Sequence, residues 1–164
     1  MKSFLFGLVA ALIVFYLGTP LFIFMHELGH AAVPLLEGEH VKIFLGSMSG
    51  VSIEIGRLEI ILGEIARAPY FGFTEWTSNS LASQIGGPLI SLLMILLVGF
   101  ATYTVRKQSA ILRQVGTAAL IAVVLQFVFT TIPMKYPEWF GHYAGMESDG
   151  LKALCLFPGV RLGC

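Results

Sequence analysis

Two histidines four residues apart are the side chains of this sequence best placed to do chemistry. They stand in the run His26-Glu27-Leu28-Gly29-His30. A four-residue step along a helix turns by about 400°, so the two imidazoles lie about 40° apart and can bind one zinc ion. Glu27 points about 100° away from His26 and can reach metal-activated water without being a ligand. The spacing therefore predicts metal-assisted hydrolysis of a peptide bond with Glu27 as the general base.

The apolar surroundings of this motif favour a functional reading. Between residues 4 and 36, the side chains that can carry a charge near neutral pH are those of His26, Glu27 and His30. Ionisable groups inside an apolar helix cost of order several kcal/mol unless they pair, bind a metal or face water, and they usually mark a functional site. The competing interpretation, two packing histidines with Glu27 as their partner, is less favoured because it must explain that cost.

A zinc ion that keeps one position for water needs a third protein ligand. Asp149 is the only aspartate of the chain, it begins an apolar segment, and Gly150 beside it permits close approach of the backbone. Two membrane crossings would return this segment to the membrane face near which His30 lies. The other candidates are His142, Glu147 and His40. We expect one zinc ion per chain, held by His26, His30 and Asp149.

The composition is that of an integral membrane protein. Of 164 residues, 56% are apolar and 12% are charged, whereas soluble domains carry about 25% charged residues. The mean hydropathy is +0.82. Ten basic residues balance ten acidic ones, so the chain has no net field to hold nucleic acid. Residues 1–164 are expected to form one domain in contact with the lipid bilayer.

Three segments are long and apolar enough to cross a bilayer. The first covers residues 4–36, and Gly-Thr-Pro at residues 18–20 interrupts it, so we expect one long helix kinked there. A helical hairpin turning at that point and a cleaved signal peptide are the alternatives. The second and third spans cover residues 81–105 and 111–132.

The charges near the span ends predict an orientation. The turn between the second and third spans carries Arg106, Lys107 and Arg113, and Lys2 precedes the first span. Basic residues favour the cytoplasmic side, so these parts are expected inside and residues 37–79 on the opposite side. A multi-pass protein of the cell membrane is the predicted localisation, and the oligomeric state cannot be read from the sequence.

The segment 39–75 is expected to form β-structure at the membrane surface. Residues 41–45 and 51–55 have strand character with turn residues between them, so they predict a hairpin. Residues 58–65 can add a third strand, and 69–73 have the composition of an aromatic interfacial loop. An exposed strand edge within residues 41–65 could hold an unwound peptide by strand addition.

Residues 148–157 are too few to span a bilayer and predict a short helix that dips into the protein. The expected fold class is therefore an all-α polytopic membrane protein. It comprises about three transmembrane helices, a short re-entrant C-terminal helix and a small interfacial β-hairpin or sheet.

These motifs together resemble the site-2 protease family of intramembrane zinc metalloproteases. The similarity rests on His26-Glu27-Leu28-Gly29-His30, Gly86-Gly87-Pro88 and Ser148-Asp149-Gly150, and it extends over about residues 21–154. The resemblance implies zinc ligands at His26, His30 and Asp149 and a catalytic base at Glu27. It also implies that the substrates are membrane-anchored proteins, cut within or near a transmembrane segment.

The chain departs from the family pattern at two positions. Where members often have asparagine, this sequence has Ser91 after the Gly-Pro and Thr130 ahead of Pro133. Ser91 and Thr130 are candidate substrate-binding residues, although packing of small polar side chains between helices would also explain them. A hydroxyl is shorter than an amide, which affects how well it can stabilise a developing oxyanion.

Two other functions compatible with the sequence differ in their chemistry. A non-catalytic metal-binding membrane adaptor or sensor would use the same ligands without a reaction. A membrane metallohydrolase could instead act on a lipid or another non-peptide bond.

Overall fold

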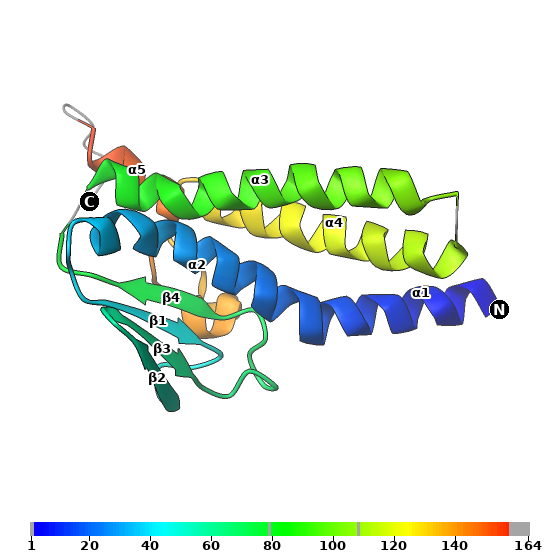
Figure 1. Ribbon diagram of the computed structural model, residues 1–164, viewed down its shortest axis with the longest axis horizontal. Coiled ribbons are helices and arrows are strands. Elements are labelled where there is room, and N and C mark those ends of the chain that lie inside the picture. The colour runs from blue at the N-terminus through cyan, green and yellow to red at the C-terminus, as the bar shows by residue number, and fades with distance from the viewer. Residues whose placement is uncertain (1, 79, 108, 158–164) are drawn as a thin grey trace.

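Three long helices lie side by side, and a small β-sheet packs against one end of them (Figure 1). The computed structural model describes residues 2–78, 80–107 and 109–157. The expected combination of long helices, a short C-terminal helix and a small sheet is present within these residues.

The first long helix runs without a break through the Gly-Thr-Pro sequence. It consists of α1 (Lys2–Ile13), a π-helical turn η1 (Val14–Gly18) and α2 (Thr19–Leu36). The N–H of Thr19 bonds to the carbonyl of Val14, five residues earlier. This wider turn stands directly before Pro20, which has no N–H to donate. The chain continues as a helix, so the turn of a helical hairpin does not form here.

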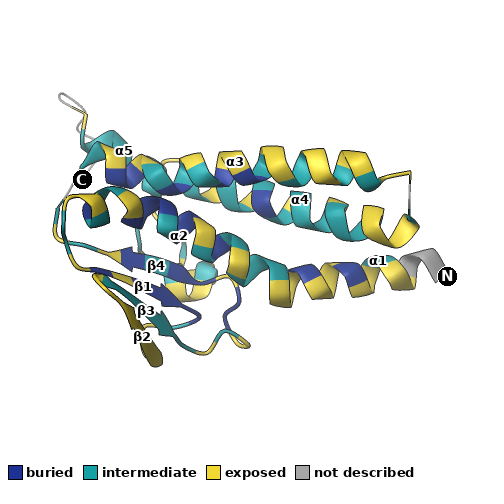
Figure 2. Ribbon diagram, in the orientation of Figure 1, coloured by how far each residue is buried: buried dark blue, intermediate teal, exposed yellow. Residues whose placement is uncertain are grey.

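The other two long helices are α3 (Leu81–Val105) and α4 (Ala110–Thr131). Together with residues 5–36, they are long and apolar enough to cross a membrane, at 32, 25 and 22 residues. Large apolar side chains such as Leu96 and Phe100 stand exposed on α3, as expected for a surface that lipid covers. Figure 2 shows exposed residues along the length of α3. The beginning of α1 and the α3–α4 turn lie at the same end of the helices.

The sheet differs from the predicted hairpin. Its strands are β1 (Val41–Leu45), β2 (Val51–Ile55), β3 (Leu58–Leu62) and β4 (Gly72–Glu75), in the order β2-β3-β1-β4. The prediction that β1 pairs with β2 is wrong, because β3 lies between them and pairs with β1 in parallel. The hairpin is formed by β2 and β3, and it turns at Gly56, whose φ of 62° suits glycine.

The fourth strand also corrects the sequence interpretation. Residues 69–73 were expected to be an aromatic loop, yet Gly72 and Phe73 already belong to β4, which pairs antiparallel with β1. The outer strands of the sheet are β2 and β4. The exposed edge expected within residues 41–65 is present at β2, and β4, outside that region, supplies a second edge beside α2 (Figure 1).

An apolar core joins α2 to the sheet. Ile23 and Ala31 on α2 are buried together with Val41, Ile43 and Leu45 of β1 (Figure 2). Strand β1 is central, so both of its neighbours and the helix cover it. This packing fixes the position of α2, and with it the histidine motif, relative to the sheet.

Two glycines bring α2 and α3 into backbone contact. A Cβ on Gly29 would overlap the carbonyl of Gly86, and a Cβ on Gly86 would overlap the carbonyl of Gly29. Small residues allow helix backbones to approach closely within a membrane protein. The glycine of the His-Glu-Leu-Gly-His motif therefore has a packing role of its own.

We predict that Gly29→Ala destabilises the protein by about 1–3 kcal/mol, because the added methyl group must push the two helices apart. Gly7→Ala in the same long helix is the control, since a Cβ there meets nothing within 4 Å. The control should be neutral or slightly stabilising. Thermal unfolding followed by circular dichroism in detergent measures both, and equal midpoints for the two variants would refute the prediction.

Candidate metal centre

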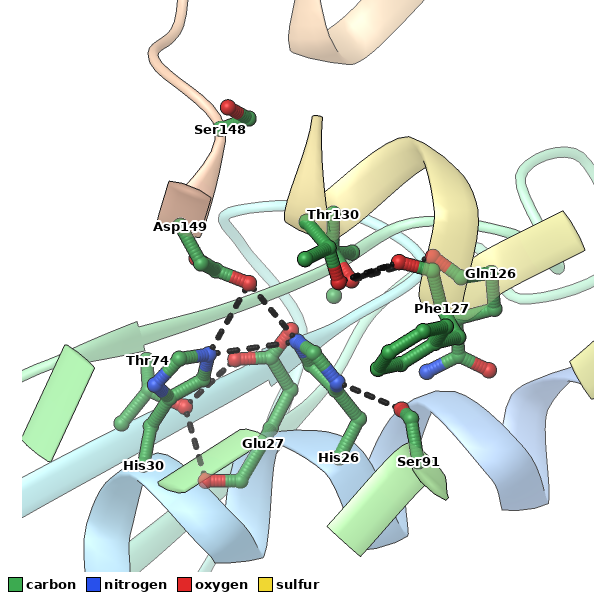
Figure 3. Close-up of polar contacts among 12 residues, drawn as sticks. His26, Glu27, His30, Thr74, Ser91, Gln126, Phe127, Thr130, Ser148 and Asp149 are labelled. Carbon is green, nitrogen blue, oxygen red and sulfur yellow. Dashed lines mark hydrogen bonds and ion pairs between the residues drawn. The ribbon is translucent and has the colours of Figure 1, made fainter. Parts of the chain in front are cut away.

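The two motif histidines meet an aspartate from the other end of the chain. His26 and His30 lie on α2, and Asp149 is the first residue of the short helix α5 (Asp149–Cys155). Oδ2 of Asp149 lies 3.0 Å from Nε2 of His26 and 3.2 Å from Nε2 of His30 (Figure 3). The two Nε2 atoms are 3.2 Å apart. The three predicted ligands thus form a compact triangle.

The outer nitrogen of each imidazole is held from α3. Nδ1 of His30 donates to the carbonyl of Ser83 at 2.7 Å, and because a carbonyl can only accept, this nitrogen carries the proton. Nδ1 of His26 lies 2.8 Å from the hydroxyl of Ser91, which can accept a hydrogen bond from it in the same way. Partners of this kind fix the ring orientation and turn the Nε2 lone pairs toward a metal ion.

The triangle has the dimensions of a coordination site. Ligands at 2.0–2.2 Å from a tetrahedral zinc ion lie about 3.3–3.6 Å from one another. The observed separations of 3.0–3.2 Å between the ligand atoms of His26, His30 and Asp149 are only slightly shorter. With no proton on either Nε2 atom, two lone pairs and a carboxylate oxygen at these distances repel one another, and a metal ion between them would satisfy all three. The group can therefore hold a metal ion.

Asp149 reaches this position because α5 is anchored at its first turn. The Ser148 hydroxyl accepts from the N–H of Leu151 and donates to the carbonyl of Ile132 at 2.7 Å. It therefore caps α5 and ties it to the end of α4. A Cβ on Gly150 would overlap the carbonyl of Thr131, so the close backbone approach expected for Gly150 is confirmed.

The charge state of Asp149 suits a ligand. Burial raises the pKa of its carboxyl group, but the neighbouring rings of His30 and His26 lower it by more. The net pKa lies below the usual range, and the carboxylate is ionised at neutral pH.

A glycine of α3 makes room for the imidazoles. A Cβ on Gly87 would overlap Nε2 of His30 and would lie 2.7 Å from Nε2 of His26. Within the sequence Gly86-Gly87-Pro88, one glycine thus meets the backbone of α2 and the next meets the metal ligands. Neither position tolerates a side chain without displacing the site.

Glu27 lies beside the triangle and is held by the sheet. The side chain is buried, and Oε2 accepts a hydrogen bond from the hydroxyl of Thr74 at 2.7 Å (Figure 3). The same hydroxyl lies 3.2 Å from the backbone carbonyl of Glu27. Among the described residues, Oε1 has no hydrogen-bond partner, so one oxygen is tethered and the other is available. No motif in the sequence marked Thr74.

These side chains stand at the polar end of a cleft of about 630 Å³. The cleft lies between α1–α2 and α4, and β4, α5 and the 3-10 helix η2 (Glu138–Tyr143) close the end that holds these side chains. Away from the ligands its walls are apolar, with Val14 and Phe15 on one side and Ile121 and Leu125 on the other. The arrangement offers an ionised, metal-binding end to a ligand that arrives along an apolar groove.

The two candidate substrate-binding residues occupy different places. Thr130 lines the cleft, but its hydroxyl donates to carbonyls of its own helix, at 3.0 Å for Gln126 and 3.2 Å for Phe127. Ser91 is fully buried and contacts His26. Substrate binding by either residue stays a prediction, and the contact of Ser91 is that of a residue that orients a ligand.

Gln126 also lines the cleft and was not singled out from the sequence. Its side-chain amide donates to the carbonyl of Phe22, one helical turn before His26, at 3.3 Å. An amide within the apolar run of residues 118–129 was the available signal.

The competing ligands lie elsewhere. The exposed His142 packs on the ring of Phe71, with centroids 5.4 Å apart. Glu147 forms an ion pair with Lys135 at 3.3 Å. His40 is exposed between α2 and β1. Within the described part of the chain, the group able to hold a metal consists of His26, His30 and Asp149.

No protein-family model, curated protein or solved structure matches this chain.

We predict that Asp149→Ala lowers the bound metal far below one ion per chain, because the two remaining imidazoles leave the site one ligand short. His142→Ala, which removes another polar residue of the same C-terminal segment, should keep the wild-type metal content. Elemental analysis of the purified variants measures both. Greater loss of metal from the His142 variant would overturn the ligand assignment.

Proposed function

We propose that this chain is an intramembrane zinc metalloendopeptidase resembling the site-2 protease family. The observation that carries the proposal is the position of Glu27. Glu27, whose Oε1 has no hydrogen-bond partner among the described residues, lines the same cleft as the ligand triangle, at the end of a groove between apolar helices. A general base beside a metal centre in a membrane-embedded cleft is the arrangement that hydrolysis of a membrane-anchored protein requires.

The ligand set favours zinc as the metal. Two neutral imidazoles and one carboxylate are common zinc ligands, and three protein ligands leave one position open for chemistry. When bound, the ion would supply Lewis acidity toward water and toward the carbonyl of the scissile bond.

The chain's own residues account for the movement of protons. Oε1 of Glu27 can accept a proton from the attacking water, whose oxygen forms the new bond to the carbonyl carbon. The same carboxyl group can then deliver that proton to the nitrogen as the C–N bond breaks, so the products are a carboxylic acid and an amine. The Thr74 hydroxyl donates to Oε2 throughout and keeps the free oxygen turned toward the cleft.

The edge of β4 can hold the substrate in an extended form. The N–H of Gly46 bonds to the carbonyl of Phe71 at 2.9 Å, which sets the alternation of bonds between β1 and β4. By this alternation, Gly72 and Thr74 direct their backbone N–H and C=O groups away from β1. A helical segment must unwind before its carbonyl groups can be attacked, and an unwound strand could pair with this edge.

Gln126 supports the chemistry at the substrate carbonyl. The hydroxyl groups of Ser91 and Thr130 already have partners in the protein. The Gln126 amide has two N–H groups, and its bond to the carbonyl of Phe22 is long at 3.3 Å. An amide donor at the cleft wall is suited to bind a substrate carbonyl.

The proposal includes a location and a substrate class. The substrates would be membrane-anchored proteins that approach through the bilayer along the apolar part of the cleft. The protein itself would be a multi-pass protein of the cell membrane with the α3–α4 turn on the cytoplasmic side.

A non-catalytic metal-binding adaptor or sensor is the second candidate function. It is favoured by one observation, the engagement of both the Ser91 and Thr130 hydroxyls within the protein. A purified, zinc-loaded sample that cuts a membrane-anchored substrate into two fragments would exclude this candidate. Fragment analysis would also distinguish peptide hydrolysis from action on a lipid.

We predict that Glu27→Gln abolishes cleavage while one zinc ion per chain remains bound, since the amide has the size of the carboxylate but cannot take up a proton. Fragment formation and metal content are measured on the same preparation. Cleavage at the wild-type rate in this variant would reject Glu27 as the base.

We predict that Thr74→Val lowers kcat by about tenfold or more and leaves KM unchanged, because a hydrogen bond to a charged group is lost at the base. Thr74→Ser keeps the hydroxyl and should restore most of the rate. Both variants should bind one zinc ion per chain, since Thr74 is not a ligand. A rate for the valine variant equal to that of the serine variant would show that the hydroxyl does not position Glu27.

A further inference from the structure

The hydroxyl of Tyr143 already occupies part of the β4 edge. Tyr143 is the last residue of η2, and its ring packs against Phe71 and Tyr136 at centroid distances of 5.1 and 5.3 Å. Its oxygen accepts from the N–H of Gly72 at 2.8 Å. The same oxygen lies 2.9 Å from the carbonyl of Gly72, to which it can donate.

These two contacts imitate one residue of a neighbouring strand. In an antiparallel ladder, a residue accepts from the N–H of its partner and donates to the partner's carbonyl. The single hydroxyl of Tyr143 makes both kinds of contact with Gly72. It also lies 3.2 Å from the carbonyl of Tyr70, so its proton can be shared between two acceptors.

The Tyr143 hydroxyl stays protonated and can therefore donate a hydrogen bond. Burial of the hydroxyl raises its pKa well above the usual value, and the nearby charge of Glu27 raises it further. The contact with Gly72 therefore persists across the physiological pH range.

Gly72, whose backbone N–H and C=O groups are occupied by the Tyr143 hydroxyl, lies next to the proposed base Glu27. A Cβ built on Gly72 would lie 3.1 Å from Oε1 of Glu27, the oxygen that has no partner among the described residues. Thr74, two residues further along β4, holds the other oxygen. A peptide strand paired with Gly72 and Thr74 would therefore lie along the two residues of β4 that contact the carboxylate.

We infer that Tyr143 is a substrate-controlling residue, whose hydroxyl must leave Gly72 before an extended peptide can pair with the full edge of β4. This inference rests on the proposed function, because it assigns the edge to the substrate of that site. The peptide replaces the bonds of Tyr143 with its own carbonyl and N–H, and the 3-10 helix η2 that carries Tyr143 moves with the exchange. Affinity for peptide is therefore set by competition between the hydroxyl and the peptide backbone.

Binding of a strand-forming peptide tests this competition without requiring cleavage. The protein is the full chain, zinc-loaded, with Glu27→Gln as the common background. The probe is a dye-labelled peptide of alternating valine and threonine, and its Kd is measured by fluorescence anisotropy. A second peptide of the same sequence, N-methylated at alternate residues, cannot donate the backbone hydrogen bonds of a strand.

We expect Tyr143→Phe to bind the unmethylated peptide about fivefold more tightly than the background, since the ring packing stays and only the competing hydroxyl is removed. The methylated peptide should show no gain. Tyr136→Phe is the matched control, because the Tyr136 hydroxyl also belongs to a residue of the cleft but donates to the carbonyl of Phe129 at 3.2 Å. It should bind both peptides as the background does.

An unchanged Kd in the Tyr143 variant, an equal gain for the methylated peptide, or no binding of either peptide to any variant would overturn the inference. Zinc content of the Tyr143 variant at one ion per chain shows that the site has folded. The two proposals fail separately, because peptide binding is read in a background that does not depend on hydrolysis. Cleavage by the wild-type chain is scored independently.

Discussion

The site depends on three acceptor atoms held about 3 Å apart inside an apolar structure. With no proton between them, two imidazole nitrogens and a carboxylate oxygen repel one another at 3.0–3.2 Å, and a metal ion would satisfy all three. The surrounding structure resists their separation. Ser83 and Ser91 orient the rings, Gly87 leaves room for them, and the capped first turn of α5 brings Asp149 to the third corner. The geometry is built by elements from both ends of the chain.

Close helix packing is what makes this convergence possible in so small a protein. Gly29 and Gly86 let α2 and α3 meet backbone to backbone, and Gly150 does the same for α5 and the end of α4. In an apolar solvent, burial of hydrophobic surface contributes little free energy to helix association. Close van der Waals packing and hydrogen bonds must therefore hold the helices together. The glycines therefore serve both the stability of the helix bundle and the distances within the metal centre.

In the proposed function, the sheet would connect peptide binding to the chemistry. Strand β4 offers an open backbone edge to the cleft, its Thr74 side chain holds one oxygen of Glu27, and its Gly72 lies against the other. A substrate that pairs with this edge would meet the base in a defined orientation, which lowers the entropic cost of the reaction. The hydroxyl of Tyr143, which bonds to Gly72, is a partner for the same edge from within the protein and would compete with a substrate there.

The sequence by itself determined the features that follow from local periodicity. The spacing of His26 and His30 placed both rings on one helix face, and runs of apolar residues located the three long helices to within one or two residues. Asp149 was preferred to His142 as the third ligand because aspartate is a common zinc ligand and because Asp149 begins an apolar segment. Tertiary structure alone decided the strand order, because pairing of β1 with β3 rather than β2 depends on contacts distant in sequence. Thr74 carries no local signal for the same reason, and the contacts of Ser91 with His26 and of Gln126 with Phe22 likewise arise only when separate helices pack together.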